Sequence, residues 1–197
     1  MNVNELNSFV FSIIDCDIVT IKNYLEKQEY DYKIVYENIN IEDIYFHNMY
    51  LKPIKGIAKA LFYNPDIAPQ LTIGLGNGRG CWGTLCNNIS ANLSVNNIQM
   101  ELNTKDSDIT RNQFRVYDGR IKGYTREVQR ILGDNNRMEF VNSGEPLWFE
   151  NTEYYKKRKI TDRINKNILM EYANKIGIDL GSNELFETTQ KSLYVEL

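Results

Sequence analysis

A glycine-rich segment is the first place where this sequence could bind a phosphate. Residues 78–83 read Gly-Arg-Gly-Cys-Trp-Gly, a G-x-G-x-x-G pattern that lets backbone N–H groups approach a pyrophosphate at the start of a helix. An expected strand over 70–75 precedes it, and Glu101, at the end of the next expected strand, could hold a ribose hydroxyl. Two features argue against a dinucleotide site. Glycines already begin at Gly74, so the loop is longer than the usual tight turn, and Trp82 is bulky where close packing needs a small side chain. The alternative is a strand-to-helix connection anchored by Trp82.

Two aspartates after an apolar run form a second candidate. Residues 15–19 read Asp-Cys-Asp-Ile-Val, which resembles the D-x-D-x-[TV] motif of haloacid-dehalogenase-like phosphatases. In that family the first aspartate is the nucleophile and the second is the general acid. Carboxylates at a strand end suit Mg²⁺ and phosphoryl transfer, and Asp134 with Glu139 could add magnesium ligands. The chain departs from that family, because isoleucine stands where glycine usually follows the second aspartate, and the family's Ser or Thr and its Lys cannot be placed. The alternative is that Asp15 ends a strand and Asp17 caps a helix.

The remaining nucleophiles and metal ligands are scattered. His47 is the only histidine, and no acid or nucleophile stands near it in a recognisable spacing, which argues against a triad or a zinc site. Cys81 and Cys86 are too far apart to share a helix face. Three cysteines without a C-x-x-C pair indicate free thiols in a reducing compartment. We therefore expect no catalytic residue, no metal and no cofactor, in a cytoplasmic protein.

Composition and charge narrow the class further. The 197 residues are 42% hydrophobic and 25% charged, as in an ordinary globular protein, and we expect one α+β domain over 1–197. The longest apolar runs are too short to cross a bilayer, and the first residues lack a secretion signal. Residues 1–50 hold nine acids against three lysines, whereas residues 111–166 hold 13 bases against eight acids. An acidic end and a basic middle can steer charged partners.

Hydrophobic periodicity predicts the secondary structure of the first hundred residues. Helices are expected where apolar residues recur every three to four positions, and strands where they alternate or run together. The expected helices cover 18–29, with Asp17 as its cap, and 82–93. The expected strands cover 8–14, 32–36, 70–75 and 97–102, and the segment 54–63 fits either form.

The second half predicts a β-meander followed by a helix. Three short β-prone runs over 114–117, 124–132 and 138–141 are separated by Asp-Gly and Asn-rich turns. An apolar stripe then recurs every four residues at Ile160, Ile164, Ile168, Tyr172 and Ile176. It predicts one long amphipathic C-terminal helix, with ion pairs Asp162–Lys166 and Glu171–Lys175, a stop at Gly177, and a closing strand over 192–195. The expected sheet is mixed or antiparallel, with packed helices.

A basic run raises the question of nucleic-acid binding. Residues 156–159 read Lys-Lys-Arg-Lys after the Tyr154-Tyr155 pair, and could contact phosphates beside stacking rings. Acids at Glu150, Glu153 and Asp162 interrupt the run, and the chain's pI is about 5.4. A solvated helix face is the better interpretation, so nucleic acid is not an expected partner.

One segment resembles a protein family. Residues 144–163 read GEPLWFENTEYYKKRKITDR and are followed by Glu171-Tyr172 and Gly177-Ile-Asp179. They resemble small bacterial cytosolic proteins that share G-E-P-L-x-F-E, a Y-Y-K-K-R helix start and a Y-x-x-x-x-G-x-D ending. Many of those proteins also carry Gly-Trp near a mid-chain helix, where this chain has Cys81-Trp82-Gly83. The family lies among uncharacterised and immunity-type proteins near polymorphic-toxin and contact-dependent growth inhibition genes, and it implies no catalytic residues.

The shared segment also has a structural explanation. Pro146 fixes the backbone after a β-run, Trp148 and Phe149 supply large apolar area for burial, and Asn151 or Thr152 can cap the final helix. It would then join the meander to that helix.

Two functions follow from the sequence. The first is an immunity-type protein that binds a cognate protein toxin, such as a nuclease, through electrostatic and shape complementarity, with no membrane partner. The expected contact residues lie in the acidic stretch, which also includes Tyr36: Asp15, Asp17, Tyr24, Glu26, Glu29, Tyr30, Asp31, Tyr32, Glu42 and Asp43. The second is a phosphate- or nucleotide-handling α/β enzyme that uses the Gly74–Gly83 loop or the Asp15/Asp17 pair.

Overall fold

One antiparallel sheet organises the chain. The computed structural model describes residues 3, 6–28, 33–37, 41, 59–76, 82–104, 111–133 and 137–196. Within these ranges nine strands are ordered β2-β9-β3-β4-β1-β5-β6-β7-β8. They are β1 (Ser8–Ile14), β2 (Lys33–Glu37), β3 (Lys59–Tyr63), β4 (Thr72–Gly76), β5 (Asn96–Asn103), β6 (Asn112–Asp118), β7 (Gly123–Leu132), β8 (Met138–Ser143) and β9 (Leu193–Glu196). Every neighbouring pair is antiparallel, so the antiparallel form of the expected sheet is confirmed.

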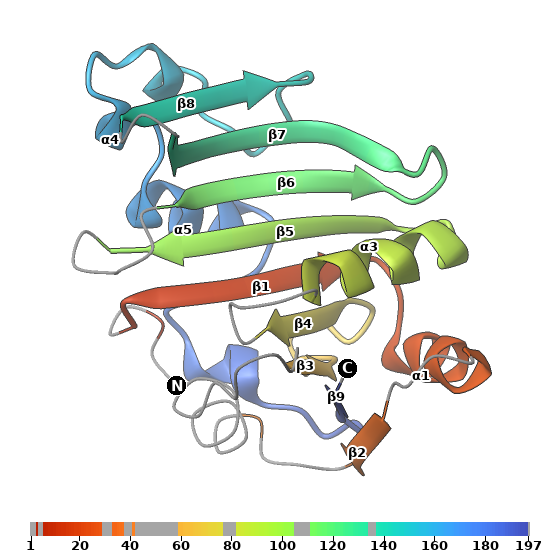
Figure 1. Ribbon diagram of the computed structural model, residues 1–197. Coiled ribbons are helices and arrows are strands. Elements are labelled where there is room, and N and C mark those ends of the chain that lie inside the picture. Colours follow the sequence, from red (N-terminus) through yellow and green to blue (C-terminus); the bar gives the residue numbers. More distant parts are fainter. Residues whose placement is uncertain are drawn as a thin grey trace.

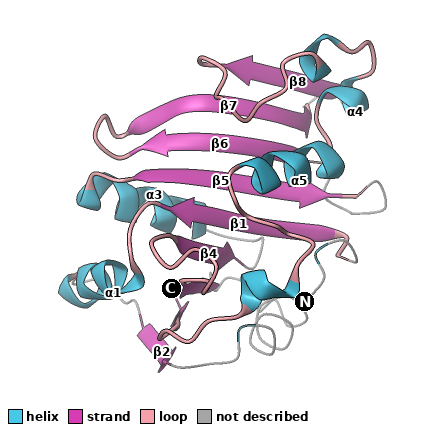
Figure 2. Cartoon of the chain, turned by 180° about the vertical axis from the view of Figure 1, so that it is seen from behind, coloured by secondary structure: helices cyan, strands magenta, loops and turns pink. Residues whose placement is uncertain are grey.

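Helices pack on both faces of this sheet. Figure 1 shows α1 (Ile18–Lys27) and α3 (Trp82–Leu93) on the near side. Figure 2 shows α4 (Ile160–Arg163) and α5 (Lys166–Lys175) on the other side. Two 3-10 turns, η3 (Tyr154–Lys156) and η4 (Asn183–Phe186), complete the described helical elements. The helices and the sheet confirm the α+β class, with the sheet as the larger part.

The pleat of β1 divides the core into two clusters. Phe9, Phe11 and Ile13 point to the α5 side, where they join Tyr172 and other buried residues. Val10 and Ile14 point to the opposite side and pack with α1 and α3. Because successive side chains of a strand face opposite sides, a strand that is covered on both faces reads as a continuous apolar run. The run 8–14 was predicted to be a buried strand for this reason, and the prediction is confirmed.

The connection from β4 to β5 explains the place of β1. Both strands run antiparallel to β1, which lies between them. They are therefore parallel to each other, and α3 forms the crossover between them. This arrangement puts the beginning of α3 over the face of β5, where the candidate site lies (Figure 1).

The first helix was predicted correctly. Asp17 is the N-cap of α1, and its Oδ1 accepts a hydrogen bond of 2.8 Å from the Thr20 N–H. The buried residues of this helix are those at the expected spacing: Ile18, Ile21, Tyr24 and Leu25. The ambiguous segment 54–63 contains the strand β3, while residues 54–58 lie outside the described ranges.

The long C-terminal helix is a wrong prediction. Ile164 is extended, with φ −151° and ψ 130°, and it separates α4 from α5. Asn165 then caps α5, since its Oδ1 accepts from the Ile168 N–H at 3.1 Å. Lys166 is buried and donates to the carbonyls of Val3 and Leu6, so the expected pair with Asp162 does not form. The apolar stripe survives because the extended residue is itself buried in the same core.

The ion pair, the helix end and the closing strand that were predicted after Ile164 are all present. Lys175 and Glu171 form an ion pair at 2.7 Å, and Gly177 has the positive φ of +87° that a helix end favours. The closing strand was expected over 192–195, and β9 covers Leu193–Glu196, one residue further along.

The joint before α4 differs from its predicted packing. Phe149 is buried in the core at 2% exposure, but Trp148 is 77% exposed. Neither Asn151 nor Thr152 caps the helix, because α4 begins after Lys159 without a side-chain cap. Asn151 instead accepts a hydrogen bond from the Glu153 N–H.

Candidate functional site

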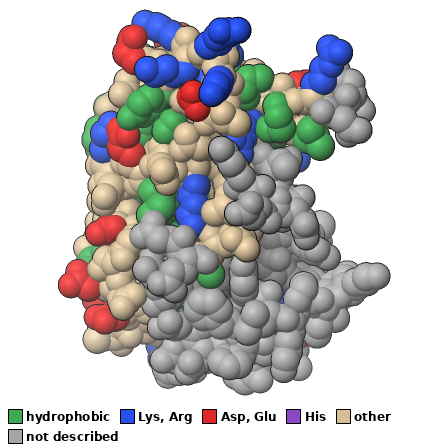
Figure 3. All heavy atoms as spheres, turned by 90° about the vertical axis from the view of Figure 1, so that its left-hand side faces the viewer, with side chains coloured by type: hydrophobic (Ala, Val, Ile, Leu, Met, Phe, Trp, Pro, Cys, Tyr) green, Lys and Arg blue, Asp and Glu red, His purple; other side chains and the backbone are tan. Residues whose placement is uncertain are grey.

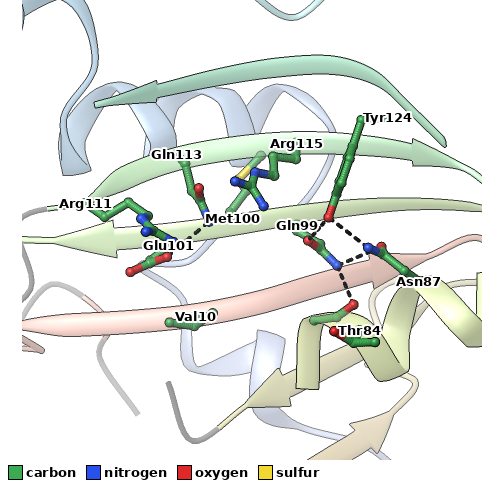
Figure 4. Close-up of a pocket in the computed structure, with 11 residues that line it drawn as sticks. Val10, Thr84, Asn87, Gln99, Met100, Glu101, Arg111, Gln113, Arg115 and Tyr124 are labelled. Carbon is green, nitrogen blue, oxygen red and sulfur yellow. Dashed lines mark hydrogen bonds between the residues drawn. The ribbon is translucent and has the colours of Figure 1, made fainter. Parts of the chain in front are cut away.

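A polar pocket lies between the beginning of α3 and the near face of β5, β6 and β7 (Figure 4). Its volume is about 260 Å³. Its walls carry amides, a carboxylate, two guanidinium groups and one aromatic ring. The lining residues are Val10, Gly83, Thr84, Asn87, Gln99, Met100, Glu101, Arg111, Gln113, Arg115 and Tyr124.

Strand pairing brings these side chains to one face. Gln99 lies opposite Arg115, and Glu101 lies opposite Gln113, in the β5–β6 ladder. Met100, between the two, contributes its side chain to the core on the other side. The alternation of polar and apolar residues in β5 therefore builds a polar wall on one face and a core on the other.

An amide network fixes α3 against this wall. The Gln99 Nε2 donates to the Gly83 carbonyl and to the Asn87 Oδ1, both at 3.0 Å. The Asn87 Nδ2 in turn donates to the Tyr124 hydroxyl at 2.8 Å. Gln99 is only 6% exposed, so these bonds satisfy polar atoms that burial would otherwise leave unpaired.

The other end of the pocket is charged. Burial raises the pKa of the Glu101 carboxyl, and the nearby Arg111 and Arg115 guanidinium groups oppose that rise. The carboxylate accepts from the Asn103 Nδ2 at 3.3 Å and from the Gln113 Nε2 at 3.1 Å. The Gln113 Oε1 is buried and has no hydrogen-bond partner among the described residues. This end can therefore contact a polar group that carries both donors and acceptors.

Beside the pocket lies a cluster that we call the open sheet face: Arg115, Tyr117, Tyr124 and Glu127. The Arg115 guanidinium lies over the Tyr124 ring, 5.3 Å from its centroid, and its Nε is 2.7 Å from Glu127. The Tyr117 and Tyr124 rings meet edge to face at 5.4 Å, and Tyr124 is 43% exposed. No described helix lies in front of β7 or β8 (Figure 1). The rings and the guanidinium are thus held in place and reach solvent.

The acidic residues predicted as contacts lie elsewhere, around α1. Asp15, Asp17 and Glu26 are exposed, and Glu26 pairs with Lys22 at 3.3 Å. Tyr24 corrects the prediction in one respect, because it is 9% exposed and belongs to the core. Its ring therefore stabilises α1 and is not free for a partner. The other predicted contacts fall outside the described residues: Glu29, Tyr30, Asp31, Tyr32, Glu42 and Asp43.

The glycine segment is described only at its ends, since Gly78 and Gly80 lie outside the described residues. Gly74 belongs to β4, where an added Cβ would lie 2.9 Å from the Phe62 ring, so its small size serves packing. A dinucleotide-binding fold has adjacent parallel strands on either side of its first helix. Here β1 lies between β4 and β5, and Glu101 points into the pocket described above.

The predicted magnesium ligands do not come together around Asp15. Glu139 is in β8, four strands from β1, a distance of about 19 Å at ordinary strand spacing. Asp134 lies outside the described residues. Within the described ranges, no group of three or more His, Cys, Asp or Glu side chains could hold a metal ion. The capping alternative for Asp17 is the one that the structure supports.

The described cysteines are free thiols of low reactivity. Cys86 is buried in the core and Cys16 is half-buried. Burial raises the pKa of each thiol to about 12, so the thiolate that would act as a nucleophile is scarce at neutral pH.

Sequence reasoning missed the pocket and the open sheet face. A signal was present, because polar residues alternate with apolar ones at Asn97, Gln99 and Glu101, and again at Gln113 and Arg115. Such alternation predicts a strand with one uncovered or polar face. It does not tell which strands become neighbours, and the site depends on that.

Comparison with protein-family models, curated proteins and solved structures found no match. In the part of the chain that the structure describes, every helix is too short or too polar to cross a membrane. The open sheet face and the pocket beside it are therefore the features that bear on function.

Proposed function

We propose that this chain is an immunity-type protein of the bacterial cytoplasm, which binds a cognate protein toxin and covers the toxin's active surface. The observation that carries the proposal is the open sheet face, where Arg115 and two tyrosines are fixed and accessible. Tyrosine and arginine are enriched among the residues that contribute most to protein–protein binding. The resemblance of residues 144–163 to immunity-type proteins points to the same class.

The geometry of the cluster favours tight binding. Long side chains lose conformational entropy when a complex forms, and this loss weakens the affinity. In the open sheet face, Arg115 is already held between Glu127 and the Tyr124 ring, and the Tyr124 hydroxyl is bonded to Asn87. These side chains are therefore largely ordered in the free protein, so they lose little further conformational entropy when the partner binds.

The acidic residues around α1 form a second surface of different chemistry. Asp15, Asp17 and Glu26 would suit a basic nuclease cleft, because opposite charges speed encounter and select partners. The two surfaces are separated by α3 in Figure 1. Variants can therefore test each of them separately.

A growth assay tests the proposal. The chain would be co-expressed with the toxin domain encoded beside its gene, and we expect the intact chain to restore growth. Arg115→Ala and Tyr124→Ala should each weaken the complex about 30-fold, the effect of losing a residue worth about 2 kcal/mol in an interface. Binding would be measured by calorimetry, and circular dichroism would establish that both variants are folded.

Matched variants identify the contact surface. Arg158→Ala removes the same charge from an exposed position outside the open sheet face and should leave affinity unchanged. Asp15→Lys and Glu26→Lys test the surface around α1 in the same growth assay. If these variants abolish protection while Arg115→Ala and Tyr124→Ala retain it, the contact lies around α1 instead. An adjacent gene that encodes no toxin, together with stabilisation by nucleotide and Mg²⁺ that Asp15→Asn abolishes, would favour the phosphate-handling enzyme.

A further inference from the structure

A buried arginine lies on the face of the sheet opposite the open sheet face. Arg130 in β7 is only 6% exposed, and its Nε has no hydrogen-bond partner among the described residues. Burial lowers the pKa of its guanidinium, and among the described residues no carboxylate opposes the effect. A buried charge left unpaired destabilises the folded state. Such a group in a native protein calls for an explanation, and a bound counter-ion is one.

Arg130 lines a cavity of about 330 Å³. Pairing of Arg130 with Asn112 and Phe140 puts it on the α5 side of the sheet, away from the open sheet face. The cavity is lined by Asn103, Thr104, Arg130, Thr161, Asp162, Asn165, Lys166 and Asn167. Its volume falls at the lower end of the range for small-molecule sites.

The beginning of α5 forms one wall of the cavity. Asn165, Lys166 and Asn167 are its cap and first two residues. The first N–H groups of a helix have no partner within the helix, and the helix dipole makes this end attractive to anions. The first turn of α5 contains no acidic residue that would already use this field. Lys166, 8% exposed, adds a second buried cation.

We propose that this cavity binds a phosphoryl group, either as inorganic phosphate or as part of a phosphate monoester. The Arg130 guanidinium donates to two oxygens, as arginine does with phosphates, and the N-terminal amides of α5 donate to the remainder. The exposed Asp162 carboxylate lies at the rim, where it would contact the ester group rather than the phosphoryl oxygens.

The charge distribution supports an anionic ligand. Figure 3 shows most of the visible Lys and Arg side chains at the end of the molecule formed by β8 and α4, with a few acidic side chains among them, and further acidic side chains nearer the other end. Because α4 contributes Thr161 and Asp162 to the cavity, this basic surface lies beside the cavity. Clustered charge of one sign raises the local concentration of ligands of the opposite sign.

Thermal unfolding in inorganic phosphate tests the proposal. Against chloride at the same ionic strength, phosphate at ten times its Kd should raise the Tm of the intact chain by about 4 °C, as expected for a chain of this length. Arg130→Gln should abolish this rise. Arg158→Gln removes the same charge from an exposed position and should keep it. A nucleoside monophosphate, measured in parallel, tests whether the ester binds more tightly than the free ion.

Two further measurements separate binding from a structural role. In phosphate-free buffer Arg130→Met should unfold at the same or a higher temperature, because it removes an unpaired buried charge; a structural arginine would give a lower Tm. NMR titration of the intact chain needs no variant, and phosphate should shift the amide signals of residues 166–168 and the Arg130 Nε–H signal.

The absence of any phosphate effect on the intact chain, or an equal effect on Arg130→Gln, would overturn the proposal. Arg115→Ala should leave phosphate binding unchanged, so this proposal stands or fails independently of toxin binding.

Discussion

β7 contains two buried arginines that differ in their hydrogen-bond partners. Whether a buried charge stabilises or destabilises the fold depends on such partners. Arg126 is 1% exposed and donates to both oxygens of Glu150, to Asn142 and to the carbonyls of Ser143 and Gly144. Arg126 is therefore satisfied, and it joins β7 to the segment after β8. Arg130 lies four residues later in the same strand, and its Nε has no hydrogen-bond partner among the described residues.

Glu150 is the residue whose loss should destabilise the fold most clearly. Its side chain is fully buried, and it accepts from Arg126, from the Leu147 N–H and from the Tyr155 hydroxyl. Glu150→Gln leaves a buried guanidinium without its counter-charge, and we expect a loss of about 3 kcal/mol in the free energy of unfolding. Urea denaturation would measure it.

The control is Glu153→Gln, which breaks the exposed pair with Lys156. Both side chains are about 70% exposed (71% and 70%), so the loss should be under about 1 kcal/mol. Equal losses in the two variants would contradict the account of Arg126 and Glu150.

At the scale of elements, the break between α4 and α5 shapes both the core and the phosphate cavity. Asn165 ends one helix and begins the next, because its Nδ2 donates to the Thr161 carbonyl while its Oδ1 accepts from the Ile168 N–H. The break frees Lys166 to bond with the carbonyls of Val3 and Leu6. In a continuous helix the N–H groups of Lys166 and Asn167 would bond within the helix, whereas these residues now begin α5 and line the cavity.

Asn165 can be tested by two substitutions. Asn165→Ala removes the cap and should lower the free energy of unfolding by about 1 kcal/mol, whereas Asn165→Ser retains a capping oxygen and should cost only a few tenths. Thermal and urea unfolding of both variants would give the difference. Equal stabilities would mean that the break does not depend on this cap.

At the scale of the whole molecule, the last strand holds the first half of the sheet together. β9 lies between β2 and β3 and pairs with both. Residues near the C-terminus therefore complete the half of the sheet whose other strands, β1 to β4, come from the first 76 residues. Such long-range pairing is costly in loop-closure entropy, and it makes the stability of the sheet depend on burial in β9.

Leu193→Ala tests this dependence. Leu193 is 1% exposed in β9, and its truncation should cost between about 2 and 5 kcal/mol in the free energy of unfolding. Leu132→Ala makes the same chemical change at a strand residue that is 48% exposed and should cost about 0.5 kcal/mol or less. A small loss at Leu193 would show that the sheet does not require its last strand.

Local patterns predicted most elements but not the candidate site. The capped helix after Asp17 and the helix beginning at Trp82 follow from spacing along a few turns, and the meander follows from its turn residues. The stripe from Ile160 to Ile176 correctly predicted burial at its three middle positions, Ile164, Ile168 and Tyr172. It predicted the wrong backbone, because periodicity does not detect a cap inside the pattern. The pocket depends on which strands pair, and no local pattern encodes that.

The sequence by itself determined the α+β class, the position of most helices and strands, and which residues are apolar enough to be buried. These features depend on interactions between residues close in the chain and on the period with which side chains change face. The tertiary structure decided the order of the strands, the insertion of β9 and the separation of Asp15 from Glu139. It also decided that Arg126 meets a carboxylate while Arg130 faces a cavity. These features depend on contacts between residues far apart in the chain, for which neither spacing nor composition carries a signal.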